Sequence, residues 1–121
     1  MPVRSLSSSV VAWPGRREVE ENLTRWARQE AARRPDLVRV GFFGSYARNA
    51  HGVGSDLDVV IVVGNTDIPK SRRPLEWDLS ALPVPADLIV FTSKEWEELQ
   101  GDERRFARVL KDETVWVYGR T

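Results

Sequence analysis

The stretch 37–63 reads LVRVGFFGSYARNAHGVGSDLDVVIVV, two apolar runs separated by a polar segment. The first run, Leu37–Phe43, is rich in β-branched and aromatic residues, which is typical of a buried strand. The second run, Leu57–Val63, is almost continuously aliphatic, as in a central strand covered on both faces. Between them, Gly44–Ser55 is dominated by Gly, Ser, Asn, His and Arg. The stretch therefore predicts two strands joined by a loop.

Upstream of the two strands, apolar residues recur at helical spacing among charged ones. They are Val19, Leu23, Trp26, Ala27 and Ala31. We expect this amphipathic helix to end near Arg34, because Pro35 and Asp36 break its pattern. Residues 1–13 begin with a serine-rich stretch, and we expect them to form a loose N-terminal segment.

The segment 64–85 contains four prolines and has the weakest pattern in the chain. We expect one short helix in it, around Leu75–Leu82, carrying Trp77. The basic stretch Lys70–Arg73 is typical of a solvated loop, with contact to RNA or a partner protein as the less favoured alternative. The following apolar run, Ala86–Phe91, predicts a third strand.

The C-terminal part predicts two helices and a strand. Ser93 is a suitable N-cap for a helix with Glu95 in its first turn, and Asp102 is expected to open a second helix. Thr114–Tyr118 then alternates as a fourth strand. The order of elements predicts an α+β or α/β fold, in which helices pack against a sheet of about four strands. At this length we expect a single domain over residues 1–121.

Composition limits the classes of partner. Lys and Arg together number 18, as do Asp and Glu, so no global charge draws the chain to nucleic acid or to an anionic membrane. There is no cysteine, which excludes disulfides and thiolate metal sites and is compatible with a reducing cytoplasm. No apolar run approaches the roughly 18 residues of a membrane span. We therefore expect a cytoplasmic protein without direct nucleic-acid or membrane binding.

Three aspartates are the candidate catalytic and metal-binding residues. Asp56 and Asp58 lie at the start of a strand and two residues apart, so their side chains point to the same side. Such a pair is costly unless a cation lies between the carboxylates, and Mg²⁺ commonly joins one or two carboxylates to substrate phosphates. Asp87 opens the third strand among apolar residues, where an acid is otherwise unfavourable. We predict that it completes the metal site and assists deprotonation of the attacking hydroxyl.

The turn after the first strand is the candidate phosphate-binding site. Gly44 lets the backbone approach a ligand closely, and the N–H groups of a helical turn together with the Ser45 hydroxyl favour phosphate oxygens. Arg48, about one turn later, adds a guanidinium that suits the same oxygens. If the two strands are neighbours, this turn and the aspartates lie at one edge of the sheet. That geometry suits nucleotidyl transfer.

The sequence Gly44-Ser45-Tyr46-Ala47-Arg48, followed by Ser55-Asp56-Leu57-Asp58-Val59-Val60, resembles the signature of the DNA polymerase β-like nucleotidyltransferase superfamily, and its minimal branch above all. The resemblance covers about half the chain, from Leu37 to Phe91. It implies a small mixed sheet flanked by helices, two magnesium ions, ATP as the nucleotide, and a catalytic triad at Asp56, Asp58 and Asp87. The family often has glycine after the arginine, where this chain has Asn49. Because asparagine tolerates left-handed backbone, we expect the turn to be kept.

Similarity to the minimal branch also implies a partner. Minimal members commonly resemble the antitoxin half of a toxin–antitoxin module whose other half is an all-helical HEPN ribonuclease. The resemblance implies neutralisation by complex formation, by transfer of AMP onto a toxin tyrosine, or by both. It leaves open an association of like or unlike chains.

Two other functions remain alternatives. The chain is a binding module if it silences a HEPN partner by covering it, without turnover. It is a small-molecule transferase if it resembles the aminoglycoside-modifying enzymes, although these generally need further protein to enclose the acceptor. A stable monomer would weigh against the second alternative.

The remaining polar and aromatic candidates favour structural roles. His51 is interpreted as a solvated turn residue, and Ser55 as a partner for the backbone that follows it, because no base is placed by sequence to activate it. The five tryptophans are expected in the core, with Trp77 and Trp96 as candidates for a partner interface.

Overall fold

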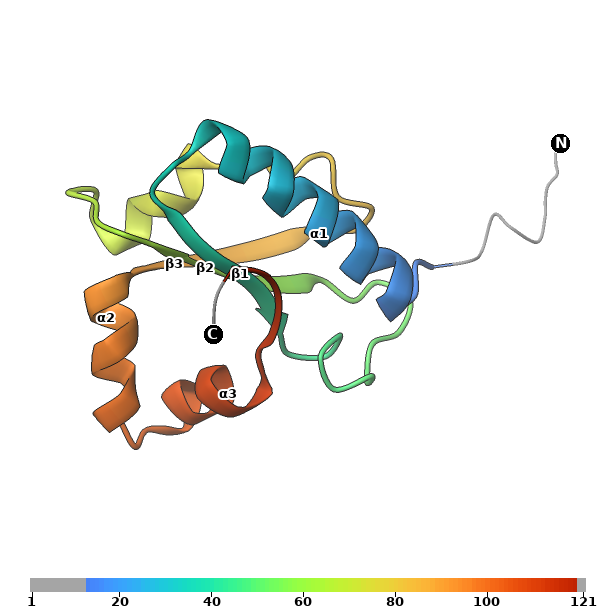
Figure 1. Ribbon diagram of the computed structural model, residues 1–121. Coiled ribbons are helices and arrows are strands. Elements are labelled where there is room, and N and C mark those ends of the chain that lie inside the picture. Colours follow the sequence, from blue (N-terminus) through green and yellow to red (C-terminus); the bar gives the residue numbers. More distant parts are fainter. Residues whose placement is uncertain (1–12, 120–121) are drawn as a thin grey trace, which may run out of the picture.

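The computed structural model describes residues 13–119, so nearly all of the expected loose N-terminal segment lies outside the described residues (Figure 1). Within them, a four-stranded sheet has the order β3-β2-β1-β4. The strands are β1 (Leu37–Phe43), β2 (Leu57–Val63), β3 (Ala86–Thr92) and β4 (Val115–Gly119). The helices are α1 (Arg16–Arg33), η2 (Lys70–Glu76), α2 (Ser93–Glu98), η3 (Leu99–Gly101) and α3 (Arg105–Glu113).

The sheet is mixed. Strand β1 pairs antiparallel with both β2 and β4, whereas β2 and β3 are parallel. The predicted fold class, a mixed sheet of four strands flanked by helices, is therefore confirmed. Strands β1 and β2 are neighbours, as the candidate site requires. Both strands have the bounds of their apolar runs, because each run is preceded by an aspartate and followed by a glycine.

Two apolar clusters cover the two faces of the sheet. Helix α1 packs on one face, where its buried Leu23 and Trp26 meet Val59 and Ile61 of β2. On the opposite face, α2 and α3 pack against the alternate β2 residues Val60 and Val62. In Figure 1, α1 and the short η2 lie above the sheet, and α2 and α3 lie below it. Every residue of β2 except Asp58 is buried, which is the reason for its unbroken aliphatic composition.

The helix predicted around Leu75–Leu82 is not formed. The insert instead contains η2 at Lys70–Glu76, a 3-10 helix that includes the stretch expected to be a solvated loop. Arg73 in this helix is buried, with hydrogen bonds from Nη1 to the Val90 carbonyl (3.0 Å) and to Glu95 (2.6 Å). These contacts with distant residues determine where the insert turns helical.

Two predicted helix starts are also corrected. Thr92, not Ser93, is the N-cap of α2, and it forms a capping box in which its hydroxyl accepts from the Glu95 N–H (3.1 Å). Asp102 does not open α3, which begins at Arg105. Its carboxylate instead accepts hydrogen bonds from the Arg104 side chain and N–H, and these bonds lower the pKa of Asp102 to about 2.

Candidate active site

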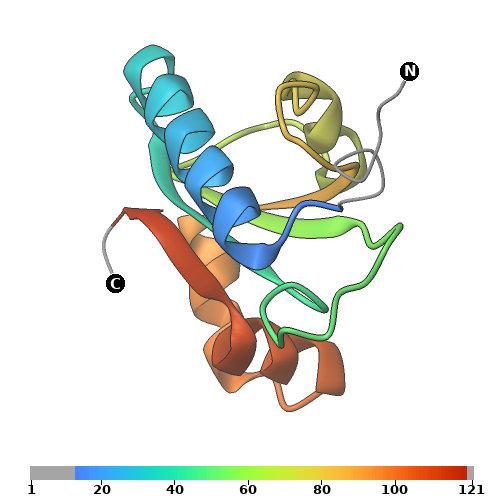
Figure 2. The ribbon, with the colours of Figure 1, turned by 90° about the vertical axis from the view of Figure 1, so that its right-hand side faces the viewer.

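The three predicted aspartates lie where β2 and β3 begin, on the face that α2 and α3 cover. This border of the sheet, formed by strand ends, is the edge named in the sequence analysis. Asp58 is the second residue of β2, and its neighbour across the parallel pair is Asp87 of β3. Asp56 precedes β2 by one residue and has the same parity as Asp58 and the buried Val60. Figure 2 looks onto this edge, with the green 44–56 segment toward the viewer. The pairing of strands thus brings together acids that lie 29 residues apart.

The electrostatics of the edge centre on Asp58. Burial raises the pKa of Asp58 above its ordinary value, and the negative charges of Asp87 and Asp56 raise it further. The positive charge of Arg48 acts in the opposite direction. The like charges of Asp56 and Asp87 therefore act on Asp58 where β2 and β3 begin, and a cation bound there would relieve this repulsion.

The turn after β1 packs directly against Asp58. Gly44 is buried with φ +78°, a left-handed conformation, and a Cβ at this position would collide with Oδ2 of Asp58. Only glycine combines this backbone conformation with the approach of the carboxylate. The requirement for glycine predicted from phosphate binding therefore has a second cause, the contact with an acid.

A single open helical turn follows Gly44. The Arg48 N–H donates to the Gly44 carbonyl (3.1 Å) and the Ala50 N–H to the Ser45 carbonyl (2.8 Å). Among the hydrogen bonds of residues 13–119, none uses the N–H groups of Ser45 and Tyr46 as donors. The N–H of Ser45, which is partly exposed, is available to an anion as at the start of a helix, whereas Tyr46 is fully buried.

Asn49 completes the turn in the left-handed region, with φ +57°. The expectation that the turn is kept with asparagine in place of the usual glycine is confirmed. Asparagine is one of the few residues with a side chain that adopts this conformation readily.

Tyr46 anchors the turn, a role that the sequence analysis missed. Its ring is fully buried, and its hydroxyl accepts from Trp13 Nε1 (2.9 Å) and donates to the Pro14 carbonyl (3.2 Å). Arg16 at the start of α1 donates to the Ala47 carbonyl (3.3 Å). These contacts hold the turn against the first residues of α1. An aromatic residue in a polar loop is the signal that could have indicated such an anchor.

Arg48 does not point freely into solvent. Its Nη1 lies 3.2 Å from Oε1 of Glu113, the last residue of α3, and both side chains are partly exposed. Glu113 was not among the predicted site residues, because it is 65 positions away in the sequence. The guanidinium is therefore held near the acids by a second element.

The donor chemistry of this edge fits magnesium. Among residues 13–119, no group of three or more His, Cys, Asp or Glu side chains is placed so that it could hold a metal ion. Mg²⁺ usually takes one or two carboxylates and completes its shell with phosphate oxygens and water. Asp58 with one or both neighbouring carboxylates, facing an anion-binding turn, matches that mode of binding. These are the residues that would hold the ion.

Two residues of the 44–56 segment differ from their predicted roles. His51 is half-buried rather than solvated, since its ring stacks on Tyr46 with the centroids 4.3 Å apart. Its Nδ1 is buried without a hydrogen-bond partner. The Ser55 hydroxyl accepts from the Gly52 N–H (2.8 Å), so it bonds to the preceding backbone and not to the following one.

The tryptophans expected at an interface are occupied within the fold. Trp96 is buried and packs edge to face with Phe91 (5.5 Å) and Trp116 (5.3 Å). Trp77 is half-buried, and the guanidinium of Arg34 lies 3.7 Å from its ring centroid. The interface prediction for Trp96 is therefore wrong.

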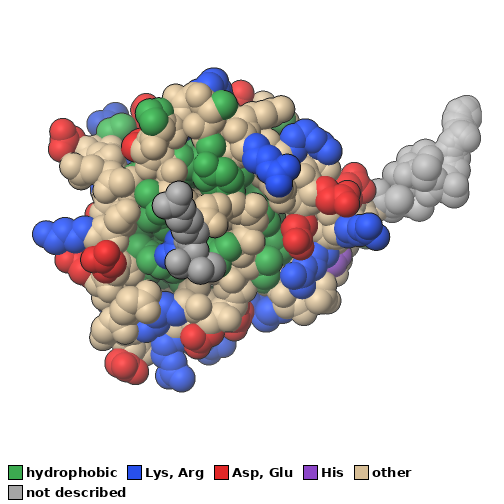
Figure 3. Space-filling model, in the orientation of Figure 1, with side chains coloured by type: hydrophobic (Ala, Val, Ile, Leu, Met, Phe, Trp, Pro, Cys, Tyr) green, Lys and Arg blue, Asp and Glu red, His purple; other side chains and the backbone are tan. Residues whose placement is uncertain are grey.

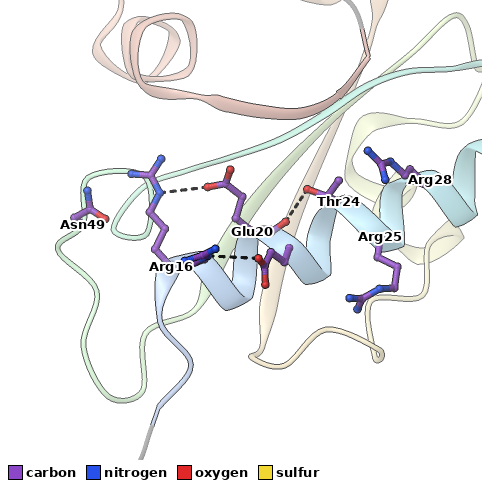
Figure 4. Close-up of a pocket in the computed structure, with 8 residues that line it drawn as sticks. Arg16, Glu20, Thr24, Arg25, Arg28 and Asn49 are labelled. Atoms are coloured by element: carbon purple, nitrogen blue, oxygen red, sulfur yellow. Dashed lines mark hydrogen bonds and ion pairs between the residues drawn. The ribbon is translucent and has the colours of Figure 1, made fainter.

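A cavity of about 790 Å³ lies away from the aspartates, along the outer side of α1 (Figure 4). Its lining residues are Arg16, Arg17, Glu20, Glu21, Thr24, Arg25, Arg28 and Asn49. The pairs Arg16–Glu20 and Arg17–Glu21, both 3.5 Å, are spaced one helical turn apart, as on a solvated helix face. Two lining residues link this cavity to the phosphate-binding turn: Asn49, which belongs to the turn, and Arg16, which donates to the Ala47 carbonyl.

The surface carries no single-sign patch on the face of Figure 3, where acidic and basic side chains alternate around the rim. This agrees with the balanced charge of the sequence. Among the described residues, no helix combines the length and the apolar composition that crossing a membrane requires.

Comparison with known proteins gives the same fold. A chain in the crystal structure of a toxin–antitoxin with AMP-PNP matches at a TM-score of 0.58 and 21% identity, over 84% of this chain and 74% of that one. A Sulfolobus solfataricus protein classed with the nucleotidyltransferases matches at a TM-score of 0.62 and 21% identity, over 87% of this chain and 84% of that one. A chain in the complex of tri-AMPylated Shewanella oneidensis HEPN toxin with MNT antitoxin matches at a TM-score of 0.52 and 20% identity, over 87% of this chain and 73% of that one. No curated protein matches the chain.

The family model described as "Nucleotidyltransferase domain" matches residues 24–117, which include the turn, the three aspartates and all four strands up to Val117. This confirms the predicted resemblance and, with it, nucleotidyltransferase as the enzyme class. Since the match extends over well more than half of the sequence, the chain belongs to the nucleotidyltransferase domain family.

Proposed function

We propose that the chain is a magnesium-dependent nucleotidyltransferase that moves AMP from ATP onto a hydroxyl group, a tyrosine of a HEPN-type toxin, and thereby acts as its antitoxin. Residues 1–121 act as one domain in this proposal, in the cytoplasm. The observation that carries it is the contact of the Gly44 turn with Asp58, which is itself flanked by Asp87 and Asp56. An anion-binding turn against clustered acids suits a metal-bound triphosphate.

The residues of the site divide into phosphate-binding and metal-binding groups. The Ser45 N–H, the Ser45 hydroxyl and the Arg48 guanidinium bind the phosphates, while Gly44 permits their approach to Asp58. Asp56, Asp58 and Asp87 are the residues that would hold magnesium, which would supply neutralisation of the triphosphate charge and activation of the hydroxyl. Asp87, at the β3 end of the row, takes or directs the proton of the acceptor.

The nucleotide and the acceptor are supported by the neighbours of the same fold. One was solved with AMP-PNP, and another is a complex containing a tri-AMPylated HEPN toxin with its MNT antitoxin. The chain spans about three quarters of each of these neighbours. We therefore favour adenylyl transfer to a protein over transfer to a small molecule.

The direct test is incubation of the chain with ATP labelled at the α-phosphate, magnesium and a purified HEPN-type partner. We expect label on the partner, loss of labelling with chelator, and loss in Asp56→Asn/Asp58→Asn. Absence of label with folded wild-type chain would reject the enzymatic role. Toxin neutralisation separates the alternative: a binding module that only covers its partner would keep neutralising it with both aspartates replaced.

A further inference from the structure

A second cavity, of about 270 Å³, lies beside the row of aspartates on the same face of the sheet. Its lining residues are Lys70, Ile89, Phe91, Leu99, Asp102, Arg104, Phe106 and Ala107. Ile89 and Phe91 share their face of β3 with Asp87, because they follow it at steps of two residues. The cavity floor therefore begins about 7 Å along β3 from the third acid.

Phe106 connects this cavity to the acids. Its ring is 52% exposed and packs edge to face on Phe43, with the centroids 6.0 Å apart. Phe43 is the register partner of Asp58 on the neighbouring strand. One wall of the cavity thus lies against the strand position next to the central acid, although no aspartate of the row lines the cavity itself.

The direction of the transfer assigns this cavity a role. Across the sheet edge the order is the Gly44 turn after β1, then Asp58 on β2, then Asp87 on β3. In phosphoryl-group chemistry the attacking and leaving oxygens lie roughly in line on opposite sides of phosphorus. If the leaving pyrophosphate is bound by the turn on the β1 side, the acceptor approaches from the β3 side, where the cavity lies.

We propose, on the basis of the proposed function, that this cavity binds the acceptor: an aromatic side chain that bears a hydroxyl, carried on an acidic segment of the partner protein. Phe106, which is half exposed, offers an aromatic wall that favours edge-to-face contact with a phenol ring, and the buried Phe91 lies beneath the cavity. The volume lies below the roughly 300–1,000 Å³ of whole small-molecule sites, which suits one side chain better than a nucleotide.

The charges around the cavity favour an acidic partner segment. Lys70 is exposed, with Nζ 4.4 Å from the centroid of Phe91. Arg104 is exposed as well and is bonded to Asp102, the only acid among the lining residues, at 2.7 Å. The lining residues therefore carry one net positive charge, which attracts carboxylates next to the acceptor.

The transfer balances with these parts. The phenolic oxygen forms a bond to the α-phosphorus of ATP, and the bond from that phosphorus to the bridging oxygen of the β-phosphate breaks. Pyrophosphate leaves on the side of the turn. The hydroxyl proton passes to the carboxylate of Asp87 and from there to water.

Binding is tested first, without turnover, on the full chain labelled with nitrogen-15. The probe is the peptide Ac-Glu-Asp-Tyr-Asp-Glu-NH2 at millimolar concentration. We expect it to shift the amide NMR signals of Ile89, Phe91 and Phe106, and Phe106→Ala to weaken its binding about tenfold. Leu75→Ala, which truncates another exposed apolar residue, is the matched control and is expected to leave binding unchanged. Absence of shifts at the cavity, or equal binding by Phe106→Ala, would overturn the proposal.

Nucleotide binding is measured in parallel to separate the two substrates. Phe106→Ala and Lys70→Ala are expected to keep the wild-type Kd for Mg-ATP and to raise the KM for the tyrosine peptide about tenfold in AMP transfer. A changed Kd for Mg-ATP with unchanged peptide binding would assign the cavity to the nucleotide base and reject the acceptor role. If the wild-type chain binds the peptide at the cavity and transfers no AMP, the proposed function fails and the binding site stands.

Discussion

At the scale of single residues, Gly44 shows how one position serves two requirements. Its left-handed backbone ends β1 and opens the turn, and its missing side chain leaves room for the carboxylate of Asp58. Sequence reasoning identified Gly44 from its place before Ser45, but contact with Asp58 depends on the pairing of β1 with β2. The position of Glu113 beside Arg48 was not predictable, since nothing local in the sequence indicates that the end of α3 lies against the turn after β1.

Gly44→Ala tests this double requirement. We expect the free energy of unfolding to fall by about 1–2 kcal/mol from the left-handed conformation alone. Because the new Cβ also displaces the Asp58 carboxylate, we expect the rate of AMP transfer to fall by more than the loss of folded protein explains. Urea unfolding and labelled-ATP assays measure the two effects. Gly52→Ala is the control, since that glycine has open space around it and no left-handed φ; wild-type transfer by Gly44→Ala would contradict the assignment.

Glu113→Gln tests the contact that holds Arg48. An exposed ion pair is worth about 0–1 kcal/mol, and bound phosphate competes with Glu113 for the guanidinium. We therefore expect the variant to bind Mg-ATP more tightly, by up to about fivefold. Titration of a fluorescent ATP analogue measures the change, with the exposed Glu97→Gln as a control. Weaker binding in Glu113→Gln would show that Glu113 positions Arg48 instead of competing for it.

At the scale of elements, local patterns predicted those parts that are stabilised by their own composition. Strands β1 and β2 begin and end as predicted, because apolar runs bounded by polar residues have one way to be buried. The insert was predicted wrongly, since η2 depends on Arg73 reaching Val90 and Glu95, which are 17 and 22 residues away. The start of α2 was misplaced by one residue because Thr92 and Ser93 are both good caps.

Glu95→Gln tests the link among η2, β3 and α2. Two hydrogen bonds from Arg73, foremost among the causes, lower the pKa of Glu95 from 4.5 to about 2. A lowered carboxyl pKa means that the contribution to stability is complete above pH 4.5 and is lost as the pH falls toward 2. We expect the variant to lose about 1–3 kcal/mol at neutral pH, because Arg73 remains buried without its carboxylate.

Urea unfolding at a series of pH values checks this expectation. The difference between wild type and Glu95→Gln should shrink as the pH approaches 2. Glu21→Gln removes the carboxylate of the exposed pair with Arg17 and should leave stability nearly unchanged. A difference between wild type and Glu95→Gln that is the same at all pH values would reject the ionic explanation.

At the scale of the whole molecule, the residues of the candidate site all lie along one border of the sheet. Length and charge balance predicted a single domain without an overall basic charge. They contain no information on the strand order that places Asp58 beside Asp87. Folding itself therefore assembles the candidate site, and ligands of that site should stabilise the whole chain.

Thermal and urea unfolding with Mg-ATP test this coupling. At a concentration of one hundred times Kd, a ligand of the folded state alone adds about 2.7 kcal/mol to the free energy of unfolding. We expect this gain for wild type with ATP and magnesium together, a much smaller gain when magnesium is chelated, and none in Asp56→Asn/Asp58→Asn. Equal stabilisation of the double variant would place the nucleotide elsewhere.

The crowding of carboxylates around Asp58 also bears on the history of the chain. Because its pKa is raised in the folded state, ionised Asp58 lowers stability at neutral pH, and a neutral replacement would relieve that cost. Mutations that gain stability without loss of function are common, so a lineage that no longer used this edge would be expected to drift toward asparagine or serine there. All three aspartates are present in this chain. The electrostatic cost at Asp58 is what we expect where an acid is kept for a bound cation.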